Sequence, residues 1–130
     1  MKMAVVKNAD KFVETFVKGI NAREVERDRY AEFAHEIEYY VSNGRKYAGV
    51  FEKSKLTGGK GRVLCFVDRE TGAMYMPASW KAPQTNHVRY VIDSDEMVEK
   101  VVNVYDFAGG FLYLDRARAF AKRDGIKFEV

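Results

Sequence analysis

The strongest constraint on the fold lies between residues 47 and 92, where short apolar runs alternate with glycine-containing turns. The clearest run, 63–67, has five apolar residues and is short enough for a buried strand. A tight turn is expected at 68–72, because glycine readily takes the positive φ that such turns need. The glycine-rich stretch 56–61 reads as a hairpin loop. This pattern predicts an antiparallel sheet, with further strands at 47–53, 73–76 and 88–92.

The first third of the chain has helical periodicity. Apolar residues up to Ile20 recur three and four positions apart, on one stripe of a helix. Asn21 with Glu24 three residues later has the form of a capping box, so a second helix is expected over 22–41. Gly19 either breaks the two segments apart or only weakens one long helix, since an interior glycine costs about 1 kcal/mol relative to alanine. Two N-terminal helices are the favoured expectation.

The last third of the chain mixes signals. Residues 97–105 fit a helix capped by Asp93, although their β-branched content keeps a strand open. A short basic helix is expected over 116–123, and alternating apolar residues predict a terminal strand over 126–130. The whole chain, 1–130, therefore reads as a single α+β domain. Two N-terminal helices pack on a mainly antiparallel sheet, and one or two short helices follow in the C-terminal third.

Composition excludes several classes of protein. Of the 130 residues, 47% are hydrophobic, which is too much apolar material for a wholly disordered chain. No apolar run approaches the roughly 20 residues that span a bilayer, so no membrane partner is expected. The single cysteine, Cys65, excludes a disulfide framework and a cysteine-rich zinc site. Its place in an apolar strand predicts a small buried hydrophobe.

Catalytic and metal sites find little support in the sequence. The bases that titrate near neutral pH are His35 and His87, and both are expected on the surface. Acidic residues cluster over 93–99 without the spacing of a calcium loop, and helix capping explains them more simply. The glycines around Lys60 precede a strand rather than a helix, which excludes a Walker A loop. We therefore expect no enzymatic activity, no cofactor and no metal.

Charge is distributed unevenly along the chain, although the net charge is only +3. The basic segment, 44–63, holds six basic residues and one acidic residue. The acidic segment, 93–106, holds five acidic residues and one basic residue. Either these two segments neutralise each other across the fold, or they lie on opposite faces and leave the basic hairpin free to bind.

Basic residues are interleaved with aromatic residues on or beside the first hairpin and near the next one. Single-stranded nucleic acid is held by such surfaces, where cations contact phosphates and aromatic rings stack on bases. The competing interpretation is that the rings are core and the cations protect a sheet edge. The residues expected to contact the backbone of DNA or RNA are Arg45, Lys46, Lys53, Lys55, Lys60 and Arg62. The residues expected to form a stacking and charge site are Trp80, Lys81 and Arg89.

Trp80 is the residue least expected to be without a role. It is the only tryptophan, and it lies in a loop with a lysine directly after it. An aromatic ring in a loop either plugs the end of a core or anchors a ligand.

A segment over 62–92 carries four short motifs in order. They are Phe66-x-Asp68 at a strand end, a Thr71-Gly72 turn, an Ala78-Ser79-Trp80-Lys81-x-Pro83 loop and an Arg89-Tyr90 strand. This segment resembles small uncharacterised proteins encoded by tailed bacteriophages. The resemblance implies a viral source and a location in the host cytoplasm or the virion, and it carries no activity. It also groups Trp80 with Arg89 and Tyr90, as if the indole folded back over their strand.

The leading hypothesis is a non-catalytic, phage-encoded accessory protein that binds single-stranded DNA or RNA. The alternative is a structural or protein-interaction protein, either a virion component or an inhibitor of a host protein. Its partners would be a second copy of itself or a host protein, and it would associate through helix 22–41 or a sheet edge.

Overall fold

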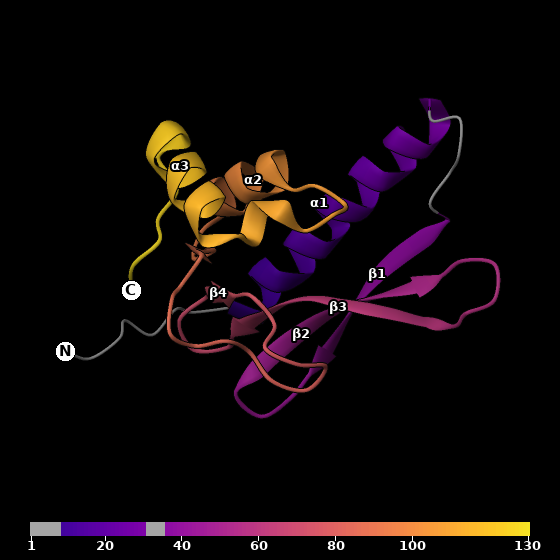
Figure 1. Cartoon of the computed structure of the whole chain (residues 1–130), viewed down its shortest axis with the longest axis horizontal. Coiled ribbons are helices and arrows are strands. Elements are labelled where there is room, and N and C mark those ends of the chain that lie inside the picture. Colours follow the sequence, from indigo (N-terminus) through magenta and orange to yellow (C-terminus); the bar gives the residue numbers. More distant parts are fainter. Residues whose placement is uncertain (1–8, 31–35) are drawn as a thin grey trace.

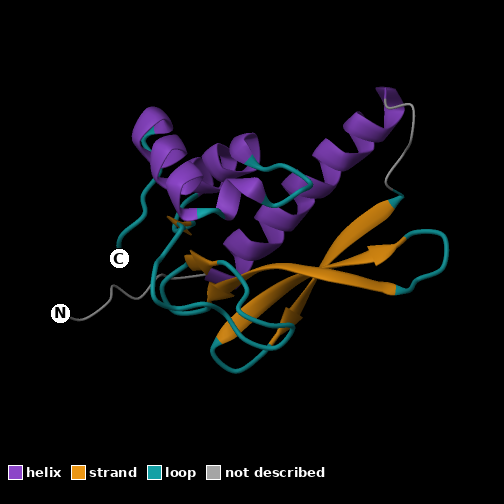
Figure 2. Cartoon of the chain, viewed as in Figure 1, coloured by secondary structure: helices purple, strands orange, loops and turns teal. Residues whose placement is uncertain are grey.

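The computed structural model describes residues 9–30 and 36–130, and it confirms the α+β class (Figure 1). In the described chain the helices form one layer and the sheet forms the other, as Figure 2 shows. In chain order the elements are α1 (Ala9–Tyr30), β1 (Ile37–Asn43), β2 (Tyr47–Ser54), β3 (Lys60–Asp68), β4 (Ala73–Tyr75), β5 (Tyr90–Val91), α2 (Asp95–Val104), the 3-10 turn η1 (Gly110–Leu112) and α3 (Leu114–Asp124).

The strands of the described chain form one antiparallel sheet in the order β1-β2-β3-β4-β5. Short turns explain the order from β1 to β4, because strands joined by tight connections pair with each other, whereas the longer loop 76–89 joins β4 to β5. The turn expected at 68–72 is confirmed. Gly72 has a φ of +78°, and Asp68 Oδ1 accepts hydrogen bonds from the backbone amides of Glu70 and Thr71. The strands expected between 47 and 76 are confirmed as β2, β3 and β4. The last expected strand is shorter, because only Tyr90–Val91 pairs.

The helices cover one face of the sheet, which we call the inner face (Figure 1). The apolar stripe of α1 includes Phe16 and Ile20, and both are fully buried. Val101 of α2 and Val50 and Val67 of the sheet belong to the same core. The opposite side of the sheet, the outer face, is turned away from the helices.

The prediction of a second N-terminal helix over 22–41 is wrong. α1 runs without a break through Gly19 to Tyr30, and residues 37–43 form β1 instead. Aromatic and β-branched residues favour strands, and here Tyr39 is buried in the core while Tyr40 lies opposite Phe51 of β2. Pairing with β2 outweighs the helical periodicity over 22–41. The periodicity reflects only neighbouring residues, whereas the pairing partners lie in β2, outside that segment.

Gly19 lies where α2 packs against α1. A Cβ at this position would lie 2.7 Å from Val102 Cγ2 of α2. The missing side chain therefore allows the two helices to approach closely, so the glycine serves the packing rather than ending a helix.

Asn21 is not a helix cap, because it lies inside α1. Its side-chain amide donates to the Tyr39 carbonyl at 3.0 Å and accepts from the Tyr39 amide at 2.7 Å. β1 is an edge strand, and exposed edge groups are templates for pairing with another chain. Asn21 occupies both backbone groups of Tyr39 and so closes the middle of this edge.

The C-terminal third is helical where the sequence left a choice. Residues 95–104 form α2, and Ser94 rather than Asp93 caps it by accepting from the Met97 amide. α3 is found as expected and ends at Gly125, which has a φ of +68°. The strand predicted over 126–130 is not formed; the Val91 amide donates to the Lys127 carbonyl as a single contact.

A chain of buried hydroxyl groups joins the helices to the sheet. The hydroxyls of Tyr39 and Tyr105 are 2.5 Å apart, and Tyr105 donates to Oε2 of Glu24, which is 2% exposed. Tyr90 donates separately to the Phe111 carbonyl at 2.7 Å. Burial raises the pKa of Tyr39, Tyr90 and Tyr105, since the phenolate form loses its hydration.

We expect the protein to unfold in alkali because of these tyrosines. Their contribution to stability is complete below the ordinary pKa of 10.0 and is lost as the pH rises above it, because the unfolded chain releases these protons first. A pH titration that follows phenolate absorbance and far-UV circular dichroism together should show the buried tyrosines ionising only as the helices unfold. Ionisation of all eight tyrosines near pH 10 with an unchanged dichroism spectrum would contradict this expectation.

Candidate functional site

The outer face carries a row of aromatic rings. The ring of Trp80 lies over that of Phe51, with centroids 5.0 Å apart. Phe51 in turn stacks on Tyr40 at 5.8 Å and meets Phe66 edge-on at 6.2 Å. These residues come from three strands and one loop, so the row exists only in the folded sheet.

Strand alternation explains why these rings share a face. Tyr40 is paired with Phe51, and Gly49 is paired with Phe66 on the next strand. Successive side chains of a strand point to opposite faces, so Gly49 and Phe51 lie on the same side. A Cβ on Gly49 would lie 2.4 Å from Cε2 of Phe51. Glycine therefore leaves the space into which the Phe51 ring folds.

Trp80 borders a depression of about 370 Å³ on this face, which we call the Trp80 groove. The indole is 42% exposed, whereas Phe51 is 9% exposed and forms part of the floor. The ring of Trp80 thus offers a free surface while resting on a buried one. The residues lining the groove are Ser42, Gly44, Arg45, Lys46, Tyr47, Phe51, Phe66, Trp80 and Lys81.

Three exposed cations, Arg45, Lys46 and Lys81, border the Trp80 groove. Within residues 9–30 and 36–130, none of the three takes part in an ion pair. Lys46 Nζ lies 5.5 Å from the ring centroid of Tyr47, a weak cation–π contact. The groove therefore combines an apolar floor with a positively charged rim.

Arg69 holds the turn that carries two of these cations. Its guanidinium pairs with both carboxylate oxygens of Asp10 in α1, at 2.9 and 2.7 Å. Arg69 Nη1 also donates to the Gly44 carbonyl at 2.6 Å. The hydrogen bonds from Arg69 lower the pKa of Asp10. α1 thus fixes the position of Arg45 and Lys46 from behind the sheet.

The loop between β4 and β5 folds into a small hairpin with Trp80 and Lys81 at its tip. The Gln84 amide donates to the Met76 carbonyl at 2.8 Å, and the Ala78 amide donates to the Ala82 carbonyl at 2.9 Å. Pro77 and Pro83 face each other as an isolated bridge between these contacts. The indole is therefore presented by an internally bonded loop.

Arg89 lies inside the protein. Contrary to the prediction, it does not form a surface site with Trp80 and Lys81. It is 4% exposed, and its guanidinium donates to the carbonyls of Leu112 at 2.6 Å and His87 at 2.9 Å. A third contact, at 3.0 Å, reaches Oε1 of Gln84. Burial lowers its pKa, although arginine stays charged in proteins. Arg89 fixes the base of the Trp80 loop.

Trp80 also packs against a different strand from the one expected. Its ring contacts Phe51 of β2 rather than the strand that carries Arg89 and Tyr90. Tyr90 is fully buried on the inner side with Phe111, so it offers no surface to the loop.

Arg62 faces the helices rather than the groove. Its Nε pairs with Glu52 at 3.0 Å, its Nη2 donates to the Phe107 carbonyl, and its guanidinium lies over the Phe107 ring. A register shift between β2 and β3 adds one β3 residue at this point. Lys60 and Arg62 therefore lie on opposite faces, although alternation over two residues predicts the same face.

A second depression of about 310 Å³, the Tyr40 pocket, is lined by Tyr40, Lys53, Gly58 and Lys60. Lys53 Nζ lies 5.6 Å from the Tyr40 ring centroid. Lys55 lies elsewhere: it lines a smaller hollow with Val25 of α1.

The basic and acidic segments do not neutralise each other. In the acidic segment, Asp93 pairs with Lys127 at 2.6 Å and Glu96 pairs with Lys100 at 3.3 Å. Among the described residues no ion pair joins this segment to the basic segment. The acidic segment includes α2, which belongs to the helix layer, whereas the groove lies on the outer face.

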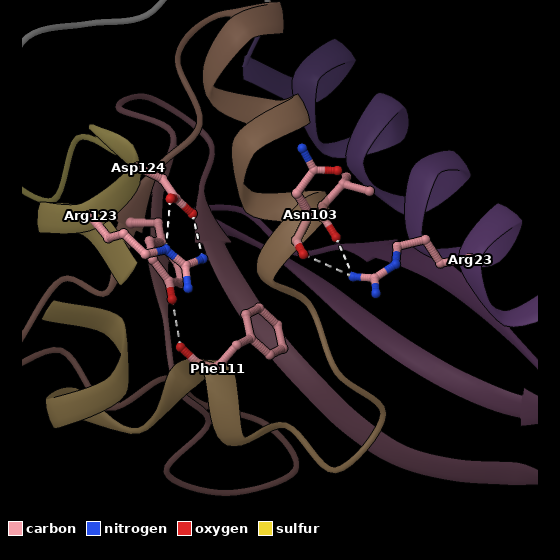
Figure 3. A network of polar contacts seen from close by, with 7 residues as sticks. Arg23, Asn103, Phe111, Arg123 and Asp124 are labelled. Carbon is pink, nitrogen blue, oxygen red and sulfur yellow. Dashed lines mark hydrogen bonds and ion pairs between the residues drawn. The ribbon is translucent and has the colours of Figure 1, made fainter. Parts of the chain in front are cut away.

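The other polar clusters have structural roles. Arg23 of α1 donates to the carbonyl of Asn103 (Figure 3). It also donates to the carbonyls of Val102 and Tyr105 and so holds the end of α2. Cys65 is fully buried as predicted, and burial raises its pKa.

His87 is exposed as predicted, and His35 lies outside the described residues. In the described part of the chain no three side chains of His, Cys, Asp or Glu gather as metal ligands. No described helix has both the length and the apolar character needed to cross a bilayer.

A family model describes almost the whole chain. The model of DUF7717, a family of unknown function, matches residues 1–114. The chain belongs to DUF7717. Neither the curated proteins nor the solved structures contain a match. In this DUF7717 chain the matched region includes every residue of the Trp80 groove, whereas nearly all of α3 lies beyond it.

Sequence reasoning missed two residues of the site in this DUF7717 protein, Tyr40 and Phe66. The periodicity over 22–41 predicts a helix for Tyr40, although the run from Tyr39 to Val41 is rich in residues that favour strands. The apolar run over 63–67 predicts a buried strand for Phe66, and only the register with Gly49 shows that its ring faces the groove.

Proposed function

We propose that this protein is a non-catalytic accessory protein that binds single-stranded nucleic acid in the Trp80 groove. One observation carries the proposal: a half-exposed indole rests on an aromatic floor, and exposed cations surround it. The phage source follows from the resemblance alone and belongs to the same proposal.

The chemistry of the groove matches the two parts of a nucleotide. A base can stack on the free side of Trp80, which is worth about 1–3 kcal/mol per base. Its phosphates can lie against Arg45, Lys46 and Lys81. A duplex hides its base faces, so this arrangement favours a single strand.

The groove lining also favours binding over catalysis. Its residues include no histidine, cysteine or carboxylate that could act as a base or nucleophile near neutral pH. The rim instead offers lysine and arginine, which are suited to phosphate contacts.

The alternative function, self-association or binding to a host protein, has less support. It relied on a helix over 22–41, which is replaced by β1 in its second half. It also relied on a free sheet edge, and Asn21 occupies the backbone groups of Tyr39 on the edge strand β1.

A fluorescence-anisotropy titration with labelled oligothymidine and oligouridine at several salt concentrations tests the proposal. We expect the three groove cations to contribute about −2 to the slope of the logarithm of the association constant against the logarithm of salt, because each contact with a phosphate of a single strand releases about 0.7 counterions. Alanine at Arg45, Lys46 and Lys81 together should remove this contribution, so that the slope becomes less steep by about 2.

The matched control is a triple alanine variant of Lys11, Lys18 and Lys122, which are exposed on the helices. This variant removes the same amount of positive charge. This control should keep most of the slope. Equal slopes for the two triple variants, or no binding by the wild type at micromolar protein and low salt, would overturn the proposed function.

A further inference from the structure

The Tyr40 pocket lies beside the Trp80 groove on the same row of rings. Phe51 contacts Trp80 on one side and Tyr40 on the other, at centroid distances of 5.0 and 5.8 Å. Phe51 of the groove floor therefore stacks on Tyr40, which lines the pocket, and this contact links the two depressions.

Two lysines at the Tyr40 pocket are placed in an electrostatically unfavourable way. Lys53 and Lys60 are directly paired between β2 and β3. Like charges directly opposite each other on a sheet repel and destabilise the pairing. Within the described residues neither lysine takes part in an ion pair. An anion held between them would remove this repulsion.

Glu38 is the carboxylate nearest to this pair in register, because it lies opposite Lys53 on β1. Lys53 forms no ion pair with it and extends over the Tyr40 ring instead. The pocket thus keeps its positive charge beside an aromatic ring.

We propose that the nucleic acid extends from the Trp80 groove across Phe51 into the Tyr40 pocket, where Lys53 and Lys60 contact a further phosphate and Tyr40 supports a further base. This inference rests on the proposed function and adds that the ligand is an extended strand rather than a mononucleotide. The unpaired lysines and the continuous row of rings are the observations that carry it.

Quenching of Trp80 fluorescence by unlabelled oligothymidines of increasing length tests the inference, because Trp80 is the only tryptophan. We expect affinity to rise from the mononucleotide to about four nucleotides, the lower limit of such binding sites. A double alanine variant of Lys53 and Lys60 should bind an eight-nucleotide strand about tenfold more weakly, while its affinity for a dinucleotide changes about twofold or less. Double alanine at Lys11 and Lys18 is the control of equal charge.

A milder variant guards against a loss of folding. Glu38→Gln removes a repulsive carboxylate, so it should strengthen binding of the eight-nucleotide strand by about twofold. If the double variant and Glu38→Gln both bind the long strand as the wild type does, the second subsite is wrong and the proposed function stands. If none of the oligonucleotides quenches the Trp80 fluorescence of the wild type, both proposals fail. If polyglutamate binds as tightly as the long strand, the surface recognises acidic polypeptides, and the inference is overturned.

Discussion

Trp80→Ala is expected to weaken binding of an eight-nucleotide single strand by about 5- to 150-fold. The range corresponds to the roughly 1–3 kcal/mol that one stacked base contributes. The indole supplies the free aromatic surface of the groove, since Phe51 beneath it is 9% exposed and cannot replace it without rearrangement. Anisotropy titrations of the wild type and the variant at one salt concentration measure the effect.

Two further variants show whether this loss is specific to stacking. Trp80→Phe retains a smaller ring and should recover part of the affinity. Tyr30→Ala removes a ring that is 78% exposed at the end of α1, and it should leave binding unchanged. An affinity for Trp80→Ala equal to that of the wild type would remove the stacking site from the proposal.

Arg89→Ala is expected to lower the free energy of unfolding by about 3 kcal/mol, the upper range for single substitutions at a buried hydrogen-bonded charge. The substitution leaves the buried carbonyl of Leu112 without its donor, removes the hydrogen bond to the His87 carbonyl and opens a cavity. Urea unfolding followed by circular dichroism measures the change. Arg89→Lys should recover little stability, because one ammonium cannot reproduce three divergent contacts.

The same variant separates a positioning role from a binding role for Arg89. Because Arg89 holds Gln84 at the base of the loop, its loss should expose Trp80 further and increase iodide quenching of its fluorescence. Arg116→Ala, which removes an exposed arginine from α3, is the matched control. An Arg89→Ala protein with wild-type stability and quenching but weakened binding would instead show direct contact with the ligand.

The central part of the fold was predictable because its signals are local. The turn at 68–72 depends on Asp68 and Gly72, and the strand at 63–67 depends on an uninterrupted apolar run. Such signals act over a few residues and need no partner from elsewhere in the chain. Residue type alone also predicts Trp80, Arg45, Lys46 and Lys81 as candidate binding residues, and the structure brings these four residues together around one groove.

The parts that failed depend on distant partners. The helical periodicity over 22–41 includes Tyr40, but this residue packs with Phe51, and its neighbour Tyr39 packs with Tyr105. Arginine is usually found on the surface, and only the buried hydrogen bond from Arg89 to the Leu112 carbonyl shows that this arginine is internal. The chemistry of these side chains is the same in either environment, so their roles could not be read from the local sequence.

The amino-acid sequence alone determined that the chain builds an antiparallel sheet with helices and that positive charge concentrates over 44–63. Only the tertiary structure decided which of those charges face a common surface. A register shift turned Arg62 toward the helices, while Lys53 and Lys60 stayed beside Tyr40. The physical reason is that the face on which a strand residue lies depends on register, and one extra residue opposite a neighbouring strand reverses it.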